Sequence, residues 1–374
     1  MEKTEDKHLV VFGGGIAGAK LAKDLSARLR VTLVDPNDYF EVPMAAPRNL
    51  VKPGFADQSI IPFAKALPDV TFVRGKLVEM GPREGLVETA DGKQIRLGGD
   101  VNVLATGSFF SNPLLRSNGA TEAERKALYA RYQGSIAGAR RILIAGGGPI
   151  GVEIAGELSE NFPDKSITIV ESGPRLLAGT SKEAADFAAS VLTRRGVTII
   201  TGERLQTTPS SPDEIFADGG EAITDKGRVI PHDLVIWCIG GRPNTDYMKA
   251  QMGHVLNTQG RIRVTPDLRV EGCDTLFALG DITDLDENKM AWHVNSQINH
   301  AATNILHVLA GRREPDNLVA HAAQTGNPLM VVTLGSRQGV AHLPFFGVVR
   351  WPWLTRKAKA ADMLVPRYRK LLGL

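Results

Sequence analysis

A turn with three glycines at a fixed spacing occurs twice in this 374-residue chain, each time between an apolar run and a segment of helical pattern. The first copy consists of an apolar run (8–12), the glycines Gly13, Gly15 and Gly18, an expected helix (19–29) and a second apolar run (30–34) that ends at Asp35. The first glycine allows a tight turn, the second lets the backbone approach a pyrophosphate, and the third lets the helix lie close to the strand. We therefore predict a dinucleotide site, with Ile16 and Ala17 inside the turn and Asp35 accepting hydrogen bonds from an adenosine ribose.

The second copy begins 133 residues later (146 − 13), a spacing that fits one domain and is too long for a short structural repeat. It consists of an apolar run (141–145), the turn Gly146, Gly148, Pro149, Ile150 and Gly151, an expected helix (152–160) and an apolar run (166–170) that ends at Glu171. We expect Glu171 to bind the 2′-hydroxyl of NADH and to repel the 2′-phosphate of NADPH, a preference that Arg175 could soften. Two such sites in series indicate a tightly held flavin and an exchangeable nicotinamide, because together they form an electron path.

Three further apolar runs end in a glycine turn. They are 101–105, which ends at Ala105 and is followed by Thr106 and Gly107, 234–239, which is followed by Gly240, and 274–279, which is followed by Gly280 and Asp281. We predict an α/β fold with two Rossmann-like dinucleotide-binding domains and a C-terminal α+β cap. The predicted boundaries are 1–112 and 259–325 for the domain of the first unit, 113–258 for the domain of the second unit and 326–374 for the cap.

Composition and charge exclude several other classes of protein. Hydrophobic residues make up 43% and charged residues 23% of the chain, which is usual for a soluble globular protein. The net charge is +3, but residues 350–374 carry seven basic side chains and a single acidic one, so the rest of the chain is mildly acidic. Nucleic-acid binding is not expected, because positive charge would then cover a folded face. No metal site is expected either, since His293, His300 and His307 lie seven residues apart, which indicates a helix stripe.

The motifs G-x-G-x-x-G, A-T-G, G-x-G-x-x-G and T-x-F-A-x-G-D, taken in this order, resemble those of the two-dinucleotide-binding flavoprotein oxidoreductases over about residues 8 to 310. Within that superfamily the chain is most similar to the ferroptosis suppressor family, on the segments 161–170, 224–227, 268–272, 289–292 and 334–340. The resemblance implies an FAD-binding domain on the first unit, with an NAD(P)H-binding domain, the second unit, inserted into it. It also implies an NAD(P)H:quinone oxidoreductase that passes hydride from NADH to flavin N5 and then reduces a lipophilic quinone such as ubiquinone or vitamin K.

The resemblance also assigns individual site residues. Asp281 is implied to bind the ribityl or pyrophosphate part of FAD, and the other implied flavin-side positions are Arg48, Val78, Met290 and Ala291. Glu153 is the implied positioning residue beside the two rings, and Lys289, the first residue of a helix expected over 289–299, is the second catalytic candidate. The plainer alternatives are a solvated first-turn acid for Glu153, a surface position for Arg48, and a helix of 289–299 that only packs.

Cysteine usage separates this chain from the disulfide reductases that share its fold. Those enzymes need a redox-active cysteine pair, whereas Cys238 and Cys273 are the two cysteines of this chain and residues 36–140 contain none. We therefore exclude disulfide reduction and expect both cysteines to pack in the core.

The two ends of the chain bear on its location. The N-terminus lacks an apolar core and has Glu2 where N-myristoylation needs glycine, and no run reaches 18 apolar residues. The C-terminal part combines Phe345, Phe346, Trp351 and Trp353 with basic residues, which suits a membrane surface, while Pro366 argues against one continuous amphipathic helix. A lid over the flavin pocket and a homodimer interface are the alternatives. We expect a cytoplasmic protein with peripheral membrane contact.

Two rival functions stay open from the sequence. One is a reductase that passes electrons to ferredoxin or to another small redox protein, which would need a basic docking face. The other is a flavoprotein without turnover whose NADH-dependent change of shape recruits a partner.

Overall fold

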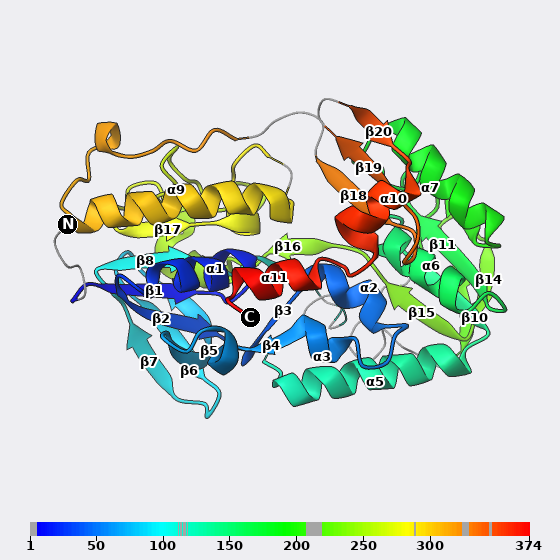
Figure 1. The fold of residues 1–374 in the computed structure, drawn as a ribbon, viewed down its shortest axis with the longest axis horizontal. Coiled ribbons are helices and arrows are strands. Elements are labelled where there is room, and N and C mark those ends of the chain that lie inside the picture. Colours follow the sequence, from blue (N-terminus) through cyan, green and yellow to red (C-terminus); the bar gives the residue numbers. More distant parts are fainter. Residues whose placement is uncertain are drawn as a thin grey trace.

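Two α/β units lie side by side, and the C-terminal residues lie against both of them (Figure 1). The computed structural model describes residues 6–110, 112, 114, 117, 119–206, 219–287, 289–323, 329–343 and 346–374.

The helices are α1 (Ile16–Leu25), α2 (Ala46–Asn49), α3 (Ala56–Ser59), α4 (Phe63–Ala66), α5 (Glu122–Gly138), α6 (Pro149–Asn161), α7 (Lys182–Arg194), α8 (Lys249–Met252), α9 (Ala291–Leu309), α10 (Pro352–Thr355), a π-helical turn (Arg356–Ala360) and α11 (Val365–Leu371). The strands are β1 (His8–Phe12), β2 (Arg30–Asp35), β3 (Tyr39–Glu41), β4 (Ile60–Pro62), β5 (Thr71–Met80), β6 (Gly85–Thr89), β7 (Gln94–Leu97), β8 (Val101–Leu104), β9 (Ser108–Phe110), β10 (Arg141–Ala145), β11 (Ser166–Glu171), β12 (Thr198–Thr201), β13 (Gly220–Ile223), β14 (Val229–His232), β15 (Leu234–Trp237), β16 (Gly241–Pro243), β17 (Leu276–Ala278), β18 (Met330–Thr333), β19 (Gly339–Leu343) and β20 (Gly347–Val349).

The first unit is built on a seven-stranded sheet in the order β17-β8-β1-β2-β5-β6-β7. The strands from β17 to β5 pair in parallel, and β5 to β7 continue as an antiparallel meander. The central strand β1 is apolar and fully buried from Leu9 to Phe12, as a strand covered on both faces requires. Helices α1 and α9 pack together over one face and join a single core cluster with this sheet.

The second unit repeats this plan with four parallel strands in the order β12-β11-β10-β15. Helices α5, α6 and α7 bury their apolar residues in its core cluster. The antiparallel ribbon of β9 and β16 connects the two units. The predicted fold class is therefore confirmed: two Rossmann-like units stand on parallel sheets (Figure 1).

The predicted strands are confirmed, but the predicted helix limits are wrong by several residues. Helix α1 covers Ile16–Leu25 instead of 19–29, and α6 begins at Pro149 instead of residue 152. In both units the middle glycine of the turn is the extended N-cap residue, so the helix begins immediately after it. The helix expected over 289–299 is α9, which runs to Leu309 and carries all three stripe histidines.

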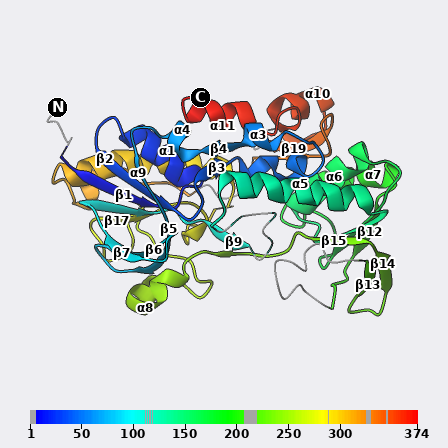
Figure 2. The same cartoon turned by 90° about the horizontal axis from the view of Figure 1, so that it is seen from below.

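The C-terminal residues form a small sheet and a helical tail. Strands β18, β19 and β20 pair in antiparallel fashion, and the buried side chains of β18 and β19 join the core cluster of the second unit. The tail then crosses to the first unit, where Val365, Tyr368 and Leu372 of the α11 region join the core cluster around α1. Pro366 lies in the first turn of α11, and the tail is not one continuous helix, as expected. Figure 2 shows α10 and α11 along the same edge of the molecule.

Within the part of the chain that the structure describes, no helix combines the length and apolar character needed to cross a bilayer.

Candidate active site

The first glycine turn holds β1 against α1 and leaves space in front of the helix. A Cβ atom at Gly18 would lie 1.8 Å from the carbonyl oxygen of Gly13, so only glycine allows this approach. A Cβ atom at Gly15, in contrast, would meet nothing within 4 Å. Because α1 begins at Ile16 and Ala17, the free N–H groups of its first turn face this space. The turn therefore fits a pyrophosphate.

Asp35 is held at the edge of the same turn. Its buried carboxylate accepts hydrogen bonds from the backbone N–H groups of Gly14 at 2.7 Å and Asn37 at 2.9 Å. Asp35 lines a cavity of about 250 Å³ together with Val78, Thr106 and Phe109. Val78 is the extra residue of a β-bulge in β5, since Leu77 and Glu79 pair with successive residues of β6. Gly75, Lys76 and Leu77 of the same strand line the cavity as well, and the cavity suits an adenosine.

The remaining flavin-side residues meet where β8 and β17 end. Ala105 N–H donates to the carbonyl of Phe12, and the Asp281 carboxylate accepts from the Ser108 hydroxyl at 2.7 Å. The N–H of Gly280 donates to the side chain of Gln297 at 2.7 Å. The structure thus brings Ala105, Thr106, Gly107, Gly280 and Asp281 together at the carboxyl ends of parallel strands. Gln297 was missed in the sequence, because nothing local links it to Gly280.

The second glycine turn has the same geometry. A Cβ atom at Gly151 would lie 2.0 Å from the carbonyl oxygen of Gly146, and one at Gly148 would meet nothing within 4 Å. Pro149 and Ile150 begin α6 directly behind that space, and Gly240 lies beyond the end of the neighbouring strand β15. A second dinucleotide fits here.

Glu171 takes in the second unit the place that Asp35 takes in the first. Its carboxylate accepts from the N–H groups of Gly147 at 2.7 Å and Gly173 at 2.6 Å. The guanidinium of Arg175 donates to four carbonyls of its own loop, at Leu177, Ala178, Thr180 and Ser181.

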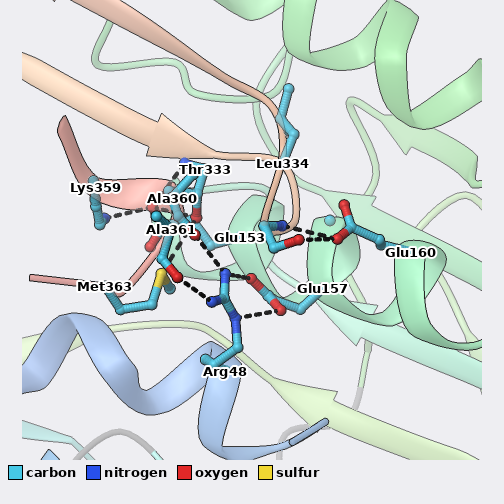
Figure 3. Close-up of polar contacts among 12 residues, drawn as sticks. Arg48, Glu153, Glu157, Glu160, Thr333, Leu334, Lys359, Ala360, Ala361 and Met363 are labelled. Carbon is cyan, nitrogen blue, oxygen red and sulfur yellow. Dashed lines mark hydrogen bonds and ion pairs between the residues drawn. The ribbon is translucent and has the colours of Figure 1, made fainter. Parts of the chain in front are cut away.

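Glu153 is buried beneath the C-terminal cap, as Figure 3 shows. It is 4% exposed, and its carboxylate accepts from Lys359 Nζ at 2.5 Å and from the backbone N–H of Thr333 at 2.9 Å. The alternative of a solvated first-turn acid is therefore wrong. Lys359 was not foreseen, because it lies 206 residues along the chain from its partner.

Arg48 is likewise buried, at 4% exposure, so the alternative of a surface position is wrong. Its guanidinium forms two hydrogen bonds with Glu157 and two with backbone carbonyls of the tail. A direct contact between Arg48 and the flavin stays a prediction, and the bonds that the structure shows tie this side chain to other groups.

Lys289 lies beside the N-terminus of α9, where Met290 is the N-cap residue and Ala291 the first helical residue. Its Nζ donates to the carbonyl of Leu285 at 2.9 Å. Burial lowers the pKa of Lys289 below its ordinary value, with the nearby Arg261 acting in the same direction. A catalytic role for Lys289 stays a prediction.

The two cysteines lie apart. Cys238 packs against the core of the second unit and Cys273 against a core cluster of the first. Burial raises the pKa of the Cys238 thiol to about 12, so this thiol is not primed for thiolate chemistry. Neither the sequence nor the fold therefore offers a redox-active pair.

Two dinucleotide cradles on Rossmann-like units, one inserted in the other, define the class of two-dinucleotide flavoprotein oxidoreductases. The chain belongs to the pyridine nucleotide-disulphide oxidoreductase family, whose model matches residues 7–304. It is an FAD-dependent NAD(P)H oxidoreductase, with FAD and NAD(H) as its cofactors.

Among curated proteins, the chain is 28% identical to apoptosis-inducing factor homolog B of Dictyostelium discoideum, over 98% of this chain and 96% of that protein. It is also 28% identical to ferroptosis suppressor protein 1 of Homo sapiens, over 96% of this chain and 94% of that protein.

Two solved structures share the fold over almost the whole chain. The sulfide:quinone oxidoreductase of Aquifex aeolicus matches with a TM-score of 0.70 at 16% identity and covers 97% of this chain and 90% of its own. NDH2 of Plasmodium falciparum in complex with NADH matches with a TM-score of 0.67 at 12% identity, over 98% and 97% of the two chains.

Proposed function

We propose that this protein is an NADH:quinone oxidoreductase that reduces a lipophilic quinone of the ubiquinone or vitamin K type. One observation carries the proposal: the same C-terminal segment brings Lys359, whose side chain is 12% exposed, to the buried Glu153 and exposes Trp351 and Trp353 to solvent. This segment thus contacts the buried Glu153 on one side and carries exposed aromatic rings on the other, and such rings suit an apolar electron acceptor. The quinone oxidoreductase among the structural neighbours and the absence of a redox-active cysteine pair from the sequence support this assignment.

The two glycine turns and the pair of Glu153 and Lys359 would have different roles in the reaction. Bound FAD would take a hydride equivalent from NADH and deliver two electrons to the quinone. We assign FAD to the turn of Gly13 and Gly15, with Asp35 at the ribose, and NADH to the turn of Gly146 and Gly148. Glu153 and Lys359 would flank the rings, where the ammonium group of Lys359 holds protons in a site that the cap shields from water.

The coenzyme would be NADH in preference to NADPH. The two backbone hydrogen bonds hold the Glu171 carboxylate beside the second turn, where a 2′-phosphate would be repelled. Because the Arg175 guanidinium already donates to carbonyls of its own loop, we expect Arg175 to weaken the preference for NADH over NADPH only slightly.

The tail would also contact a membrane surface. Trp351 and Trp353 are 60% and 63% exposed and stack with their ring centroids 6.1 Å apart. Phe346 and Trp292 are exposed as well, and Arg367 lies over the Trp292 ring. Exposed aromatic rings beside basic side chains are typical of proteins that bind the interface of an anionic bilayer. Phe345, which the sequence interpretation included, lies outside the described residues.

The decisive experiment uses the visible spectrum of the purified protein followed by anaerobic titration with NADH. We expect a yellow flavin spectrum that bleaches on NADH and returns when a water-soluble short-chain quinone is added. Steady-state turnover with that quinone should exceed turnover with a ferredoxin of equal concentration. Faster turnover with ferredoxin would favour the protein reductase, and turnover with every acceptor far below about 1 per second would favour the flavoprotein without turnover.

A further inference from the structure

One face of α6 carries three glutamates at helical spacing, and all three are bound to groups outside the helix. Glu153, Glu157 and Glu160 lie four and three residues apart, so their side chains share a face. Glu153 accepts from Thr333 and Lys359, and Glu160 accepts from the backbone N–H of Ser336 at 3.1 Å. These two contacts hold the cap (Figure 3). The middle glutamate, Glu157, binds the first unit instead.

Glu157 forms a two-point ion pair with Arg48 of α2. Arg48 Nε and Nη2 donate to the two carboxylate oxygens at 2.8 and 2.7 Å, and Glu157 is 0% exposed. A buried pair of this kind contributes little net stability, since both charges lose their hydration. Its geometry is nevertheless specific, because the planar guanidinium matches the carboxylate at two points. The pair thus fixes α2 of the first unit against α6 of the second.

Arg48 also binds the tail of the chain. Nη2 donates to the carbonyl of Ala360 at 2.8 Å, and Nη1 donates to the carbonyl of Ala361 at 3.2 Å. These carbonyls lie at the end of the π-helical turn, where helical carbonyls lack partners within the helix. A buried cation at that end satisfies them and complements the negative end of the helix dipole. One guanidinium therefore joins α2, α6 and the tail.

The tail changes direction immediately beyond this point. Met363 and Leu364 have φ values of 53° and 63°, in the left-handed region that side chains rarely adopt. Such backbone persists where the surroundings determine it, and Met363 is fully buried. On one side of this bend the tail contacts the cap and α6, and on the other side α11 packs on the first unit.

We infer that Arg48 and Glu157 are a positioning pair for catalysis, which fixes the tail so that Lys359, the residue before Ala360, stays bound to Glu153. The inference rests on the proposed function, in which Glu153 and Lys359 flank the reacting rings. Arg48 acts through the tail backbone, and the pair has no need to touch the cofactor.

The test replaces both members of the pair at once, with the double variant Arg48→Met and Glu157→Met. Replacing one member alone by methionine would leave a buried unpaired charge and strongly destabilise the protein, whereas two apolar residues of similar length often preserve stability. The replacement also removes both hydrogen bonds to the tail carbonyls. The matched control is Arg263→Met with Glu271→Met, an exposed ion pair of the same residue types in the first unit.

Three measurements on the holoprotein are compared: hydrogen exchange of residues 356–364, flavin affinity, and steady-state kinetics with NADH and a short-chain quinone. For the double variant we expect faster exchange in 356–364, unchanged flavin affinity, an unchanged KM for NADH, and a kcat reduced on the order of 100-fold. Arg48→Lys keeps the positive charge but loses the two-point hydrogen bonding of the guanidinium, so its kcat should lie between those of the parent and the double variant.

Two results would overturn the inference. If exchange in 356–364 and kcat both match those of the control, the pair is only structural. If flavin affinity falls while exchange stays unchanged, Arg48 is a cofactor ligand. If the parent protein reduces no quinone, the proposed function fails. Hydrogen exchange in 356–364 would still show whether the pair fixes the tail, so the two failures are distinguished.

Discussion

Glycines three positions apart in the same turn have different tasks in this protein. Gly151 is needed by the fold, because its Cβ would lie within 2.0 Å of the backbone of Gly146. Among the described residues, none requires glycine at position 148, because a Cβ there would meet none of their atoms within 4 Å. The first unit repeats the contrast at Gly18 and Gly15. The space that the protein keeps clear is thus the space for a phosphate group.

Gly148→Ala should therefore keep the fold and weaken NADH binding. We expect far-UV circular dichroism, melting temperature and flavin content close to those of the parent, with KM for NADH raised about tenfold or more, which is about 1.4 kcal/mol or more. Gly151→Ala, its matched control, should lower the yield of folded protein, since backbone would have to move. Unchanged NADH kinetics in Gly148→Ala would show that the pyrophosphate lies elsewhere.

The acids and glycines of the two turns were predictable from the sequence, because strand, turn, helix and acid follow one another within about 30 residues. The partners of Glu153 and Arg48 were not. Lys359, Glu157 and the carbonyl of Ala360 lie 109 to 312 residues away along the chain. No local pattern indicates such contacts, because they depend on how the first unit, the second unit and the C-terminal residues pack against one another.

Helix α6 has three functions within its thirteen residues. Its first turn faces the space proposed for NADH, its apolar face packs into the core, and its third face holds the cap. Gly156 makes the last contact close: a Cβ there would lie 2.6 Å from the Cα of Leu334 and 2.7 Å from the N of Gly335. A mid-helix glycine, unfavourable by about 0.5–1 kcal/mol relative to alanine, is kept for this approach.

Gly156→Ala should consequently destabilise the protein although alanine favours helices. Backbone atoms of the cap cannot yield as a side-chain tip can, so we expect a loss of about 1–3 kcal/mol in urea unfolding. Gly134→Ala in α5 is the matched control, because a Cβ there meets nothing within 4 Å. That change should stabilise by about 0.5–1 kcal/mol. Equal effects of the two substitutions would contradict the packing argument.

The starts of β10 and β15 are tied together by Asp233. Its carboxylate accepts from the Arg141 guanidinium at 2.6 Å and from the N–H groups of Arg140 and Arg141. The Arg141 side chain, followed by these backbone donors, lowers the pKa of Asp233 to about 2. In the unfolded chain the pKa of an aspartate is about 3.9. The folded state is therefore favoured above pH 4, and this advantage disappears as the pH falls toward 2.

Asp233→Asn should accordingly lower the melting temperature at pH 7 and do so less and less below pH 4. Melting curves of parent and variant between pH 3 and pH 7 measure the difference directly. Asp186→Asn is the control, because Asp186 forms an exposed pair with Lys182 of the same helix. A difference that stays constant with pH would mean that the carboxylate charge is not the cause.

The division of the whole molecule into two units was predictable from the sequence, because the dinucleotide-binding motif is local and occurs twice. The way in which the C-terminal residues bind was not predictable. The tail begins against the second unit and ends in the core of the first, with Tyr368 beside Phe40, so it joins the two units. Charge and aromatic content alone indicated a surface. The buried side of the tail depends on apolar partners about 300 residues earlier, which no pattern within the tail can report.

This arrangement changes how membrane binding must be tested. Removing the tail would uncover the core around Val365, Tyr368 and Leu372. Truncated protein would then bind lipid through this uncovered core, and the experiment would not report on the surface of the tail. The better variant is Trp351→Ser with Trp353→Ser, because both rings are exposed and neither belongs to a core cluster. These rings lie beside Arg350 and the basic π-helical turn, which would face anionic headgroups.

We expect the parent protein to co-sediment with vesicles that contain phosphatidylserine, and to do so less as salt rises. The double tryptophan variant should bind roughly tenfold more weakly and keep its activity with a water-soluble quinone. The matched control is Ile223→Ser with Val229→Ser on the β13–β14 hairpin, since these residues are exposed as well and the hairpin lies at the opposite edge from α10 in Figure 2. If both double variants bind vesicles as the parent does, the tail is not the membrane surface. The exposed tryptophans would then be candidates for the contact between two copies of the chain, which sedimentation velocity would detect.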